Sequence, residues 1–199
     1  MVGRNGRAAI ANEVKQPQAP HTCLGEWLRA ATSLTFGLSE DPAVELIIRP
    51  ALASDARSIG NLARQFASYL SELGDLTEFK LTPNAYLRDG FGTEPAFAGL
   101  VAEDQSKVIG YLLYHFGYDS DRAARNMHVV DLYVDRATRN QGVGKALMAR
   151  AASIARKASA EEMIWSVYRS NTSAAAFYEK LGAQRITDVF FMKLSAGKI

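Results

Sequence analysis

The sequence is poor in the residues that build disulfides and metal sites. Its 199 residues include one cysteine, Cys23, and three histidines, His21, His115 and His128. A single cysteine cannot form an internal disulfide, and no Cys/His spacing matches a zinc site. We therefore expect no metal and a reducing compartment, which makes the cytoplasm the expected location.

The sequence also lacks a charge excess and a long apolar run. Its 23 basic residues are balanced by 21 acidic ones, which leaves a formal net charge of +2. Such a balance does not favour nucleic acid or an anionic membrane as a partner, so any positive site must be local. No segment approaches the roughly 18 apolar residues of a membrane-spanning helix. The early arginines are followed by Glu13 and Lys15, which argues against a signal peptide and secretion.

Apolar periodicity begins late in the chain. Residues 1–43 open with Gly, Asn, Gln and Pro and have only a weak helical pattern at their end. We expect them to form an N-terminal extension that is partly flexible. Residues 44–199 are expected to form one domain.

Within residues 44–199, strand-like and helical patterns alternate. Hairpin-like strand pairs and strand–helix–strand units both occur, which predicts an α/β or α+β domain around a mixed sheet. Asp55 is expected to be the N-cap of the first helix. The expected helices are residues 55–73, 83–88, 143–155 and 170–181, and the expected strands are residues 44–50, 96–103, 107–118, 127–134, 162–168 and 189–194.

The stretch "RNQGVGKALM", residues 139–148, combines two glycines with basic residues, as phosphate-binding loops do. It is not a nucleoside triphosphate loop, because Ala146 stands where Ser or Thr is required after Gly-Lys. Nor is it a dinucleotide fingerprint, because Leu147 stands at the third glycine position.

The general physics of such loops still applies. Gly142 and Gly144 let the backbone come close to a ligand, and the N–H groups of residues 140–145 at a helix N-terminus can bind a pyrophosphate. Arg139 and Lys145 would add positive charge. The alternative interpretation is an ordinary surface turn before a helix.

The surrounding residues favour the first interpretation. "VVDLYVDRATRNQGVGKALMARA" followed by "NTSAAAFYEKLGAQ" resembles the paired acetyl-CoA motifs of the GNAT N-acetyltransferases. "IRPALASDARSI", "YLRDGFGTEP", "GYLLYHFGYDS" and "FYEKLGA" are similar to its diamine branch, the spermidine/spermine and thialysine acetyltransferases. The resemblance covers about residues 46–194.

This resemblance implies a fold and an association state. The fold would be a mixed central sheet of about six to seven strands, flanked by about four helices and splayed by a bulge at the motif strand. Acetyl-CoA would be the co-substrate, without a metal. A homodimer is also implied, in which "VFFMKL", residues 189–194, packs against or exchanges with the other subunit.

The resemblance also implies how coenzyme A is bound. Backbone groups of the motif strand would hold the pantetheine, the glycine loop would hold the pyrophosphate, and Ile164–Ser166 would close the other side of the cleft. The expected cofactor-binding residues are Leu132, Tyr133, Val134, Arg139, Asn140, Gln141, Gly142, Val143, Gly144, Lys145, Asn171, Ala174 and Tyr178.

Two residues are expected to move protons. Tyr178 matches the motif tyrosine, and a phenol with a pKa near about 10 is protonated at neutral pH and can donate to a departing thiolate. An amine of pKa about 10.4 is only about 0.1% neutral at pH 7.4, a handicap of roughly 4 kcal/mol. Asp131 is expected to lower this energy cost by taking a proton from the amine through water, or to bind the cationic tail of the acceptor. The alternatives are a core tyrosine and a surface carboxylate paired with an arginine.

The acceptor is predicted less sharply. Tyr69 and Glu72 are expected to bind substrate with Asp131, and Asp75 and Glu78 follow in the same acidic loop. Val130 and Leu70 replace acidic residues of the polyamine enzymes, which argues against spermidine.

The predicted activity is direct acetyl transfer to the primary amine of a small diamine-like or amino-acid-like acceptor. Two alternatives stay open. A protein lysine or N-terminal acetyltransferase would need an open peptide groove. A non-catalytic acyl-CoA-binding regulatory module would need no proton donor.

Overall fold

The computed structural model describes residues 46–195 and 197. The predicted extension, residues 1–43, and its boundary near residue 44 lie outside the described residues. Both stay predictions.

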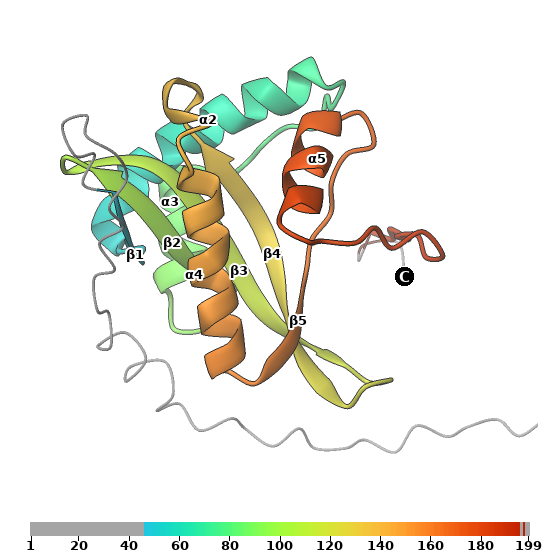
Figure 1. The fold of residues 1–199 in the computed structure, drawn as a ribbon. Helices are drawn as coiled ribbons and strands as arrows, with labels where there is room; N and C mark the ends of the chain where they lie inside the picture. Colours follow the sequence, from blue (N-terminus) through green and yellow to red (C-terminus); the bar gives the residue numbers. More distant parts are fainter. Residues whose placement is uncertain (1–45, 196, 198–199) are drawn as a thin grey trace, which may run out of the picture. The chain divides into compact units, whose positions relative to one another are not determined.

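A mixed sheet forms the centre of the described domain, as the sequence predicts. Its strands lie in the order β1-β2-β3-β4-β5 (Figure 1). The pairs β1–β2, β2–β3 and β3–β4 are antiparallel, and the pair β4–β5 is parallel. Strands β2, β3 and β4 follow one another directly along the chain, whereas two helices separate β1 from β2 and a crossover helix leads from β4 to β5. The strands are β1 (Ile47–Pro50), β2 (Ala98–Asp104), β3 (Lys107–Asp119), β4 (Ala124–Val134) and β5 (Ala160–Ile164).

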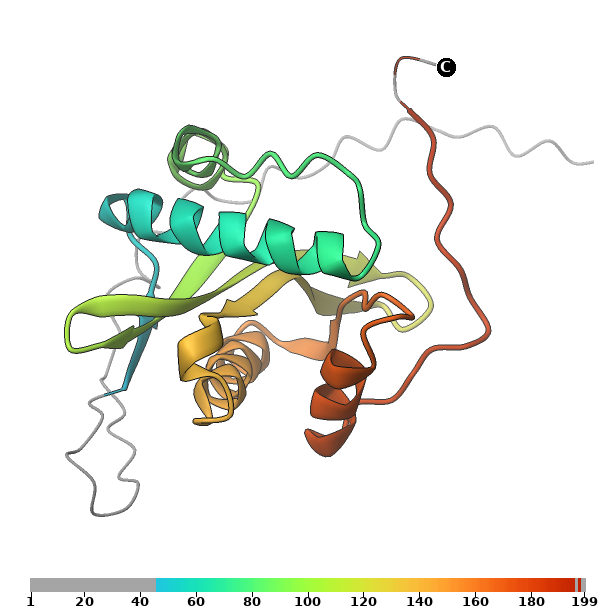
Figure 2. The ribbon, with the colours of Figure 1, turned by 90° about the horizontal axis from the view of Figure 1, so that it is seen from above.

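Helices cover both faces of the sheet. Figure 2 shows α2 and α3 on one face and α4 and α5 on the other. The predicted apolar stripe of the first helix is confirmed, since Ile59, Leu62 and Ala63 are buried. The helices are α2 (Ala56–Glu72), α3 (Pro83–Phe91), α4 (Val143–Lys157) and α5 (Thr172–Lys180), with short 3-10 turns at Ala53–Asp55 and Arg136–Thr138.

Strand β3 supplies apolar side chains to both layers. Tyr111 and Leu113 belong to the cluster under α2, while Leu112 and Tyr114 belong to the cluster under α4. A strand buried on both faces reads as a continuous apolar run, which explains "GYLLYHF". The sheet therefore separates two cores.

A β-bulge interrupts β4. Leu113 pairs with Asp131 and Tyr114 pairs with Val129, so Val130 has no partner on β3. Val129 belongs to the cluster under α4, whereas Asp131 lies opposite Leu113 of the other cluster. The bulge thus confirms the expected irregularity of the motif strand, and it turns Asp131 toward the α2 face.

The sheet also splays beyond this point. The pairing of β4 with β5 runs from Arg125 opposite Ala160 to His128 opposite Ile164 and ends there. Strand β4 continues to Val134, so the β5-facing edge of its last half has no neighbouring strand among the described residues.

The structure differs from the predicted strands at two places, in the end of one strand and in the absence of another from the described residues. The described residues form five strands, and β5 ends at Ile164 although the apolar pattern runs on to Tyr168. "VFFMKL" is not a strand: Val189 is 65% exposed and Phe191 87%. A strand needs a neighbour for its backbone hydrogen bonds, and this segment has none in the described chain.

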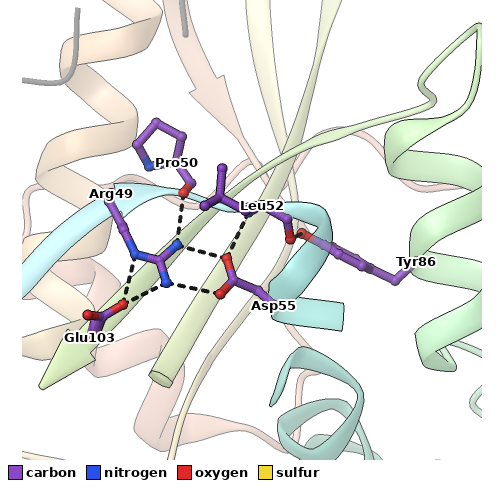
Figure 3. A network of polar contacts seen from close by, with 6 residues as sticks. All are labelled: Arg49, Pro50, Leu52, Asp55, Tyr86 and Glu103. Carbon is purple, nitrogen blue, oxygen red and sulfur yellow. Dashed lines mark hydrogen bonds and ion pairs between the residues drawn. The ribbon is translucent and has the colours of Figure 1, made fainter. Parts of the chain in front are cut away.

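The role expected for Asp55 also differs in the structure. Asp55 precedes α2, but its carboxylate makes no capping hydrogen bond to the helix. Instead it accepts two hydrogen bonds from Arg49, of 2.8 and 2.9 Å, and one of 2.7 Å from the Leu52 N–H (Figure 3). The preceding 3-10 turn already holds Asp55 in a helical conformation, which directs the side chain away from the α2 N–H groups.

The Arg49 side chain joins three elements. Its guanidinium also donates to Glu103 of β2, at 2.6 and 2.8 Å (Figure 3). Burial raises the pKa of Asp55, but the hydrogen bonds from Arg49 and Leu52 outweigh it and hold that pKa below its ordinary value. The network ties β1, β2 and the start of α2 together.

Candidate active site

A cavity of about 590 Å³ opens where β4 and β5 diverge. Its walls are the second half of β4, the glycine loop, the connection from β5 into α5, the end of α2 and the loop after α2. The predicted site residues that line it are Tyr69, Asp131, Leu132, Tyr133, Val134, Arg139, Asn140, Gly142, Val143, Gly144, Lys145, Asn171, Ala174 and Tyr178.

Two predicted residues lie elsewhere. Gln141 is exposed in the glycine loop and is not part of the cavity wall. Glu72 accepts a hydrogen bond of 2.6 Å from Arg136 on the surface and also stays outside the wall. The acidic side chains that do line the cavity in this region are Asp75 and Glu78.

The glycine loop has the geometry of an anion site. Gly142 is the N-cap of α4 with φ of +82°, and Asn140 has φ of +63°. The Ala146 N–H donates to the Gly142 carbonyl at 2.9 Å, so α4 begins its hydrogen bonding there. The N–H groups of the turn before Ala146 have no acceptor within the helix, and they carry the positive end of the helix dipole.

Gly144 is required for a different reason. A Cβ atom at this position would lie 3.3 Å from the Phe177 ring of α5 and 3.9 Å from Val134. The absence of a side chain lets α5 pack against the start of α4. Gly142 therefore supplies a backbone conformation and Gly144 a close approach.

Arg139 is fixed by contacts that the sequence does not reveal. Its Nε donates to the Val134 carbonyl at 3.1 Å. Its guanidinium carbon lies 5.0 Å from the centre of the Tyr69 ring and 5.2 Å from that of Tyr133. Cation–π contacts of this kind hold a guanidinium without neutralising it, which leaves its charge for an anion.

Asp131 has a strongly shifted pKa. Burial raises the pKa of this carboxyl to about 6, and the nearby Tyr111 hydroxyl only partly opposes that rise. A carboxylate with a pKa this close to neutrality is mostly ionised at pH 7.4 and is a stronger base than an exposed aspartate.

The pKa of Tyr178 is raised as well. Burial, together with the negative charge of Asp131, raises the pKa of the phenol to about 12. Its ring packs 4.9 Å from Trp165 and 5.0 Å from Phe177, measured between ring centres. Tyr178 therefore stays protonated across the physiological range and is suited to donate a proton.

Asn171 caps α5, the helix that carries Tyr178. Its side-chain oxygen accepts a hydrogen bond of 3.1 Å from the Ala174 N–H and one of 2.8 Å from the Tyr69 hydroxyl. The side chain is buried, with 8% of the residue exposed. These bonds use the Asn171 side-chain oxygen and the Ala174 N–H, two groups of residues that the sequence predicts to lie at the cofactor.

The sequence does not predict how the loop after α2 meets the segment that follows β5. Tyr168, just beyond β5, donates a hydrogen bond to Asp75, and Ser170 donates to the Leu73 carbonyl at 3.2 Å. Phe66, Thr77 and Phe79 also line the cavity. No local pattern predicts such contacts, because the partners are more than ninety residues apart.

Charged side chains of both signs line the cavity. The basic ones, Arg139 and Lys145, belong to the glycine loop. The acidic ones are Asp131 of β4 and Asp75 and Glu78 of the loop after α2. The lining therefore offers partners to both an anionic and a cationic group.

Residues 46–195 and 197 contain neither a cluster of metal ligands nor a membrane-spanning helix. Within this part no group of three or more His, Cys, Asp and Glu side chains is placed to hold a metal ion. None of its helices has the length and apolar character to span a bilayer.

The chain matches known proteins over most of its described length. Residues 64–183 match the family model described as Acetyltransferase (GNAT) family. Thialysine N-epsilon-acetyltransferase of Bos taurus is 33% identical over 151 residues, which cover 72% of this chain and 86% of that protein. Spermidine/spermine N(1)-acetyltransferase-like protein 1 of Homo sapiens is 32% identical over 143 residues, 68% of this chain and 20% of that protein.

Solved structures share the fold. A possible acetyltransferase from Clostridium difficile 630 has a TM-score of 0.64 at 19% identity, covering 75% of this chain and 97% of its own. An aminoglycoside N-acetyltransferase in complex with CoA has a TM-score of 0.63 at 18% identity, covering 79% and 99%.

Proposed function

Because the chain belongs to the GNAT family of acetyltransferases, we propose that it transfers acetyl directly from acetyl-CoA to the primary amine of a small diamine-like or amino-acid-like acceptor. The observation that carries the proposal is the cavity itself. It joins a basic glycine loop to a carboxyl group of raised pKa and a protonated phenol.

The cofactor half of the proposal rests on the glycine loop and the open edge of β4. The N–H groups at the start of α4, with Arg139 and Lys145, would bind the pyrophosphate of coenzyme A. The unpaired edge from Leu132 to Val134 offers backbone groups to the pantetheine and an N–H to the thioester oxygen.

The chemical step needs two proton movements. The acceptor nitrogen would form a bond to the thioester carbonyl carbon, and the carbon–sulfur bond would then break. An acceptor that arrives as an ammonium ion first releases one proton to solvent, and Asp131 then takes the second proton that the nitrogen loses as the amide forms, directly or through water. Tyr178 gives its proton to the departing sulfur, and protons and charges balance over the two residues.

The acceptor half rests on the acidic wall. Asp75, Glu78 and Asp131 favour an acceptor that carries a second positive charge. The thialysine and spermidine/spermine relatives support the same class. Val130, which lines the cavity at the bulge, removes an acidic position of the polyamine enzymes and favours a shorter acceptor than spermidine.

Thiol release from acetyl-CoA tests the proposal. The acceptor panel would contain short diamines, thialysine-like amino acids, spermidine, aminoglycosides and lysine peptides, and Tyr178→Phe would be the control. Turnover with short diamines or amino acids is expected. Turnover with peptides alone would replace the acceptor by a protein lysine or N-terminus. Tight coenzyme A binding without turnover would indicate a non-catalytic module.

We also propose a homodimer. Beyond α5 the chain exposes Ile186, Val189 and the run Phe190–Met192, each at least 65% exposed, and Figure 2 shows this segment leaving the helices and sheet. Exposed apolar runs of this size mark interfaces, and a second copy would cover this one. Light scattering is expected to give twice the chain mass, and Phe190→Glu with Phe191→Glu to give a monomer.

The proposal also covers the N-terminal extension, residues 1–43, and the location of the protein in the cell. We propose that residues 44–199 form the catalytic domain, so that a chain without residues 1–43 keeps its turnover. A cytoplasmic location is supported by the lone Cys23. Fractionation of cells that express the full chain tests it.

A further inference from the structure

We infer that Tyr69 is a positioning residue that couples the cofactor loop to helix α5 and does not bind the acceptor. The inference rests on the proposed acetyl transfer, and it replaces the acceptor role expected for this side chain. It depends on two separate contacts, one made by the hydroxyl group and one by the ring.

The hydroxyl contact reaches α5. The Tyr69 hydroxyl, on α2, donates a hydrogen bond of 2.8 Å to the side-chain oxygen of Asn171, which also accepts one from the Ala174 N–H. Asn171 is the N-cap of α5, so the bond fixes the start of the helix that carries Tyr178. A cap bonded on both sides holds its helix in one position and direction.

The ring contact reaches the glycine loop. The Arg139 guanidinium lies 5.0 Å from the Tyr69 ring centre and 5.2 Å from that of Tyr133. Tyr133 donates in turn to Gln65, one helical turn before Tyr69 on α2, at 3.3 Å. One face of α2 therefore holds Arg139 through two aromatic rings.

These contacts occupy the Tyr69 ring, the group on which a cationic acceptor would pack, and direct its hydroxyl toward α5. Its hydroxyl proton is donated to Asn171, and its ring is occupied by Arg139. The binding of an acetyl donor at Arg139 and the orientation of Tyr178 thus depend on one side chain. Tyr69 reaches the reacting atoms only through these other residues.

Two substitutions separate the contacts. Tyr69→Phe keeps the ring and removes the hydrogen bond, so we expect kcat to fall about 3- to 10-fold with the KM for acetyl-CoA nearly unchanged. Tyr69→Leu removes both, so we expect the KM for acetyl-CoA to rise about 3- to 20-fold as well. Tyr118→Phe, which removes a hydroxyl from a 66% exposed tyrosine outside the cavity, is the matched control and should match the parent chain.

A double-mutant cycle checks the hydroxyl partner. Tyr69→Phe combined with Asn171→Ala should lower kcat no further than Asn171→Ala alone, because both changes break one bond. Thermal unfolding of each variant identifies any loss caused by misfolding. An additive loss in properly folded variants would contradict the coupling.

Other results overturn the inference directly. A raised acceptor KM with unchanged kcat in Tyr69→Phe would show that Tyr69 binds the acceptor. An unchanged KM for acetyl-CoA in Tyr69→Leu would remove the contact with Arg139. If the parent chain shows no turnover, the proposed function fails, but coenzyme A binding by calorimetry to Tyr69→Leu still confirms or refutes the ring contact.

Discussion

The Asp131 carboxylate lies near enough to Tyr178 that its negative charge helps to raise the pKa of that phenol to about 12. Burial, in the same cavity, raises the pKa of Asp131 to about 6. Between these two values one group is ionised and the other protonated. A base and an acid are therefore available together over the physiological range.

The first prediction concerns the acid limb of the pH profile. Protonation of Asp131 below about pH 6 should lower kcat/KM, in addition to the loss caused by protonation of the amine. Asp131→Asn should lower kcat about 10²-fold or more and abolish the inflection near pH 6. A pH series with both proteins measures this, and an inflection that persists in the Asn variant would assign it to another group.

The second prediction concerns the alkaline limb. Because the pKa of Tyr178 is about 12, its ionisation should cause no loss of activity up to pH 10. Tyr178→Phe should lower kcat about 10- to 100-fold while the KM for acetyl-CoA stays within about twofold. Equal rates for the Phe variant and the parent chain at all pH values would exclude Tyr178 as the acid.

The third prediction concerns Gly142. An alanine there must adopt φ near +82°, which costs about 1 kcal/mol, and its methyl group would project where the anion is expected. We expect the coenzyme A dissociation constant to rise about tenfold. Gly182→Ala is the control. Gly182 also has a positive φ, +92°, and a Cβ added there would meet no described atom within 4 Å, but it lies outside the cavity. Calorimetry should show affinity lost in the first variant alone.

The fourth prediction concerns stability. The pKa of Asp55 is depressed in the folded chain, so its contribution is present above the unfolded pKa of about 3.9 and is lost as pH falls through the lower folded value. Asp55→Asn should lower the free energy of unfolding by about 2–3 kcal/mol at pH 7 and flatten its decline in acid.

Asp89→Asn serves as the comparison for Asp55. Asp89 pairs with Arg88 on the surface, where an ion pair contributes little. Urea unfolding should show a much smaller change for Asp89→Asn than for Asp55→Asn. Equal losses in the two variants would show that the Arg49 network adds nothing beyond a surface pair.

The fifth prediction concerns the acceptor. Val130 sits at the bulge, lines the cavity and is 45% exposed, so a glutamate there would add negative charge beside Asp131. We expect Val130→Glu to lower the KM for spermidine about tenfold, while Val130→Gln leaves it near the parent value. An equal effect of both substitutions would show that shape, and not charge, decides the acceptor.

The parts of the site that the sequence predicts are local ones. The glycine loop, the α4 start and the "NTSAAAFY" cap are each encoded within a few neighbouring residues, and the structure brings them to one cavity. The geometry of a turn or of the start of a helix is determined by neighbouring residues, so a sequence pattern can predict it.

The parts that could not be predicted depend on contacts between distant residues. The bond from Tyr69 to Asn171 spans 102 residues, and Asp55 binds Arg49 because a 3-10 turn directs its side chain away from the helix. The apolar pattern of residues 189–194 indicates burial, but a pattern does not name the neighbour that would provide it.

The divergence of β4 and β5 has a consequence for local stability. Among the described residues, the amides of Val129–Val134 on the β5 side of β4 have no strand to bond to, although β4 itself lies between β3 and β5. They should exchange with deuterium faster than those paired with β3, and slow sharply when a ligand forms hydrogen bonds with that edge. The bound ligand would then take the place of a neighbouring strand along this edge of β4.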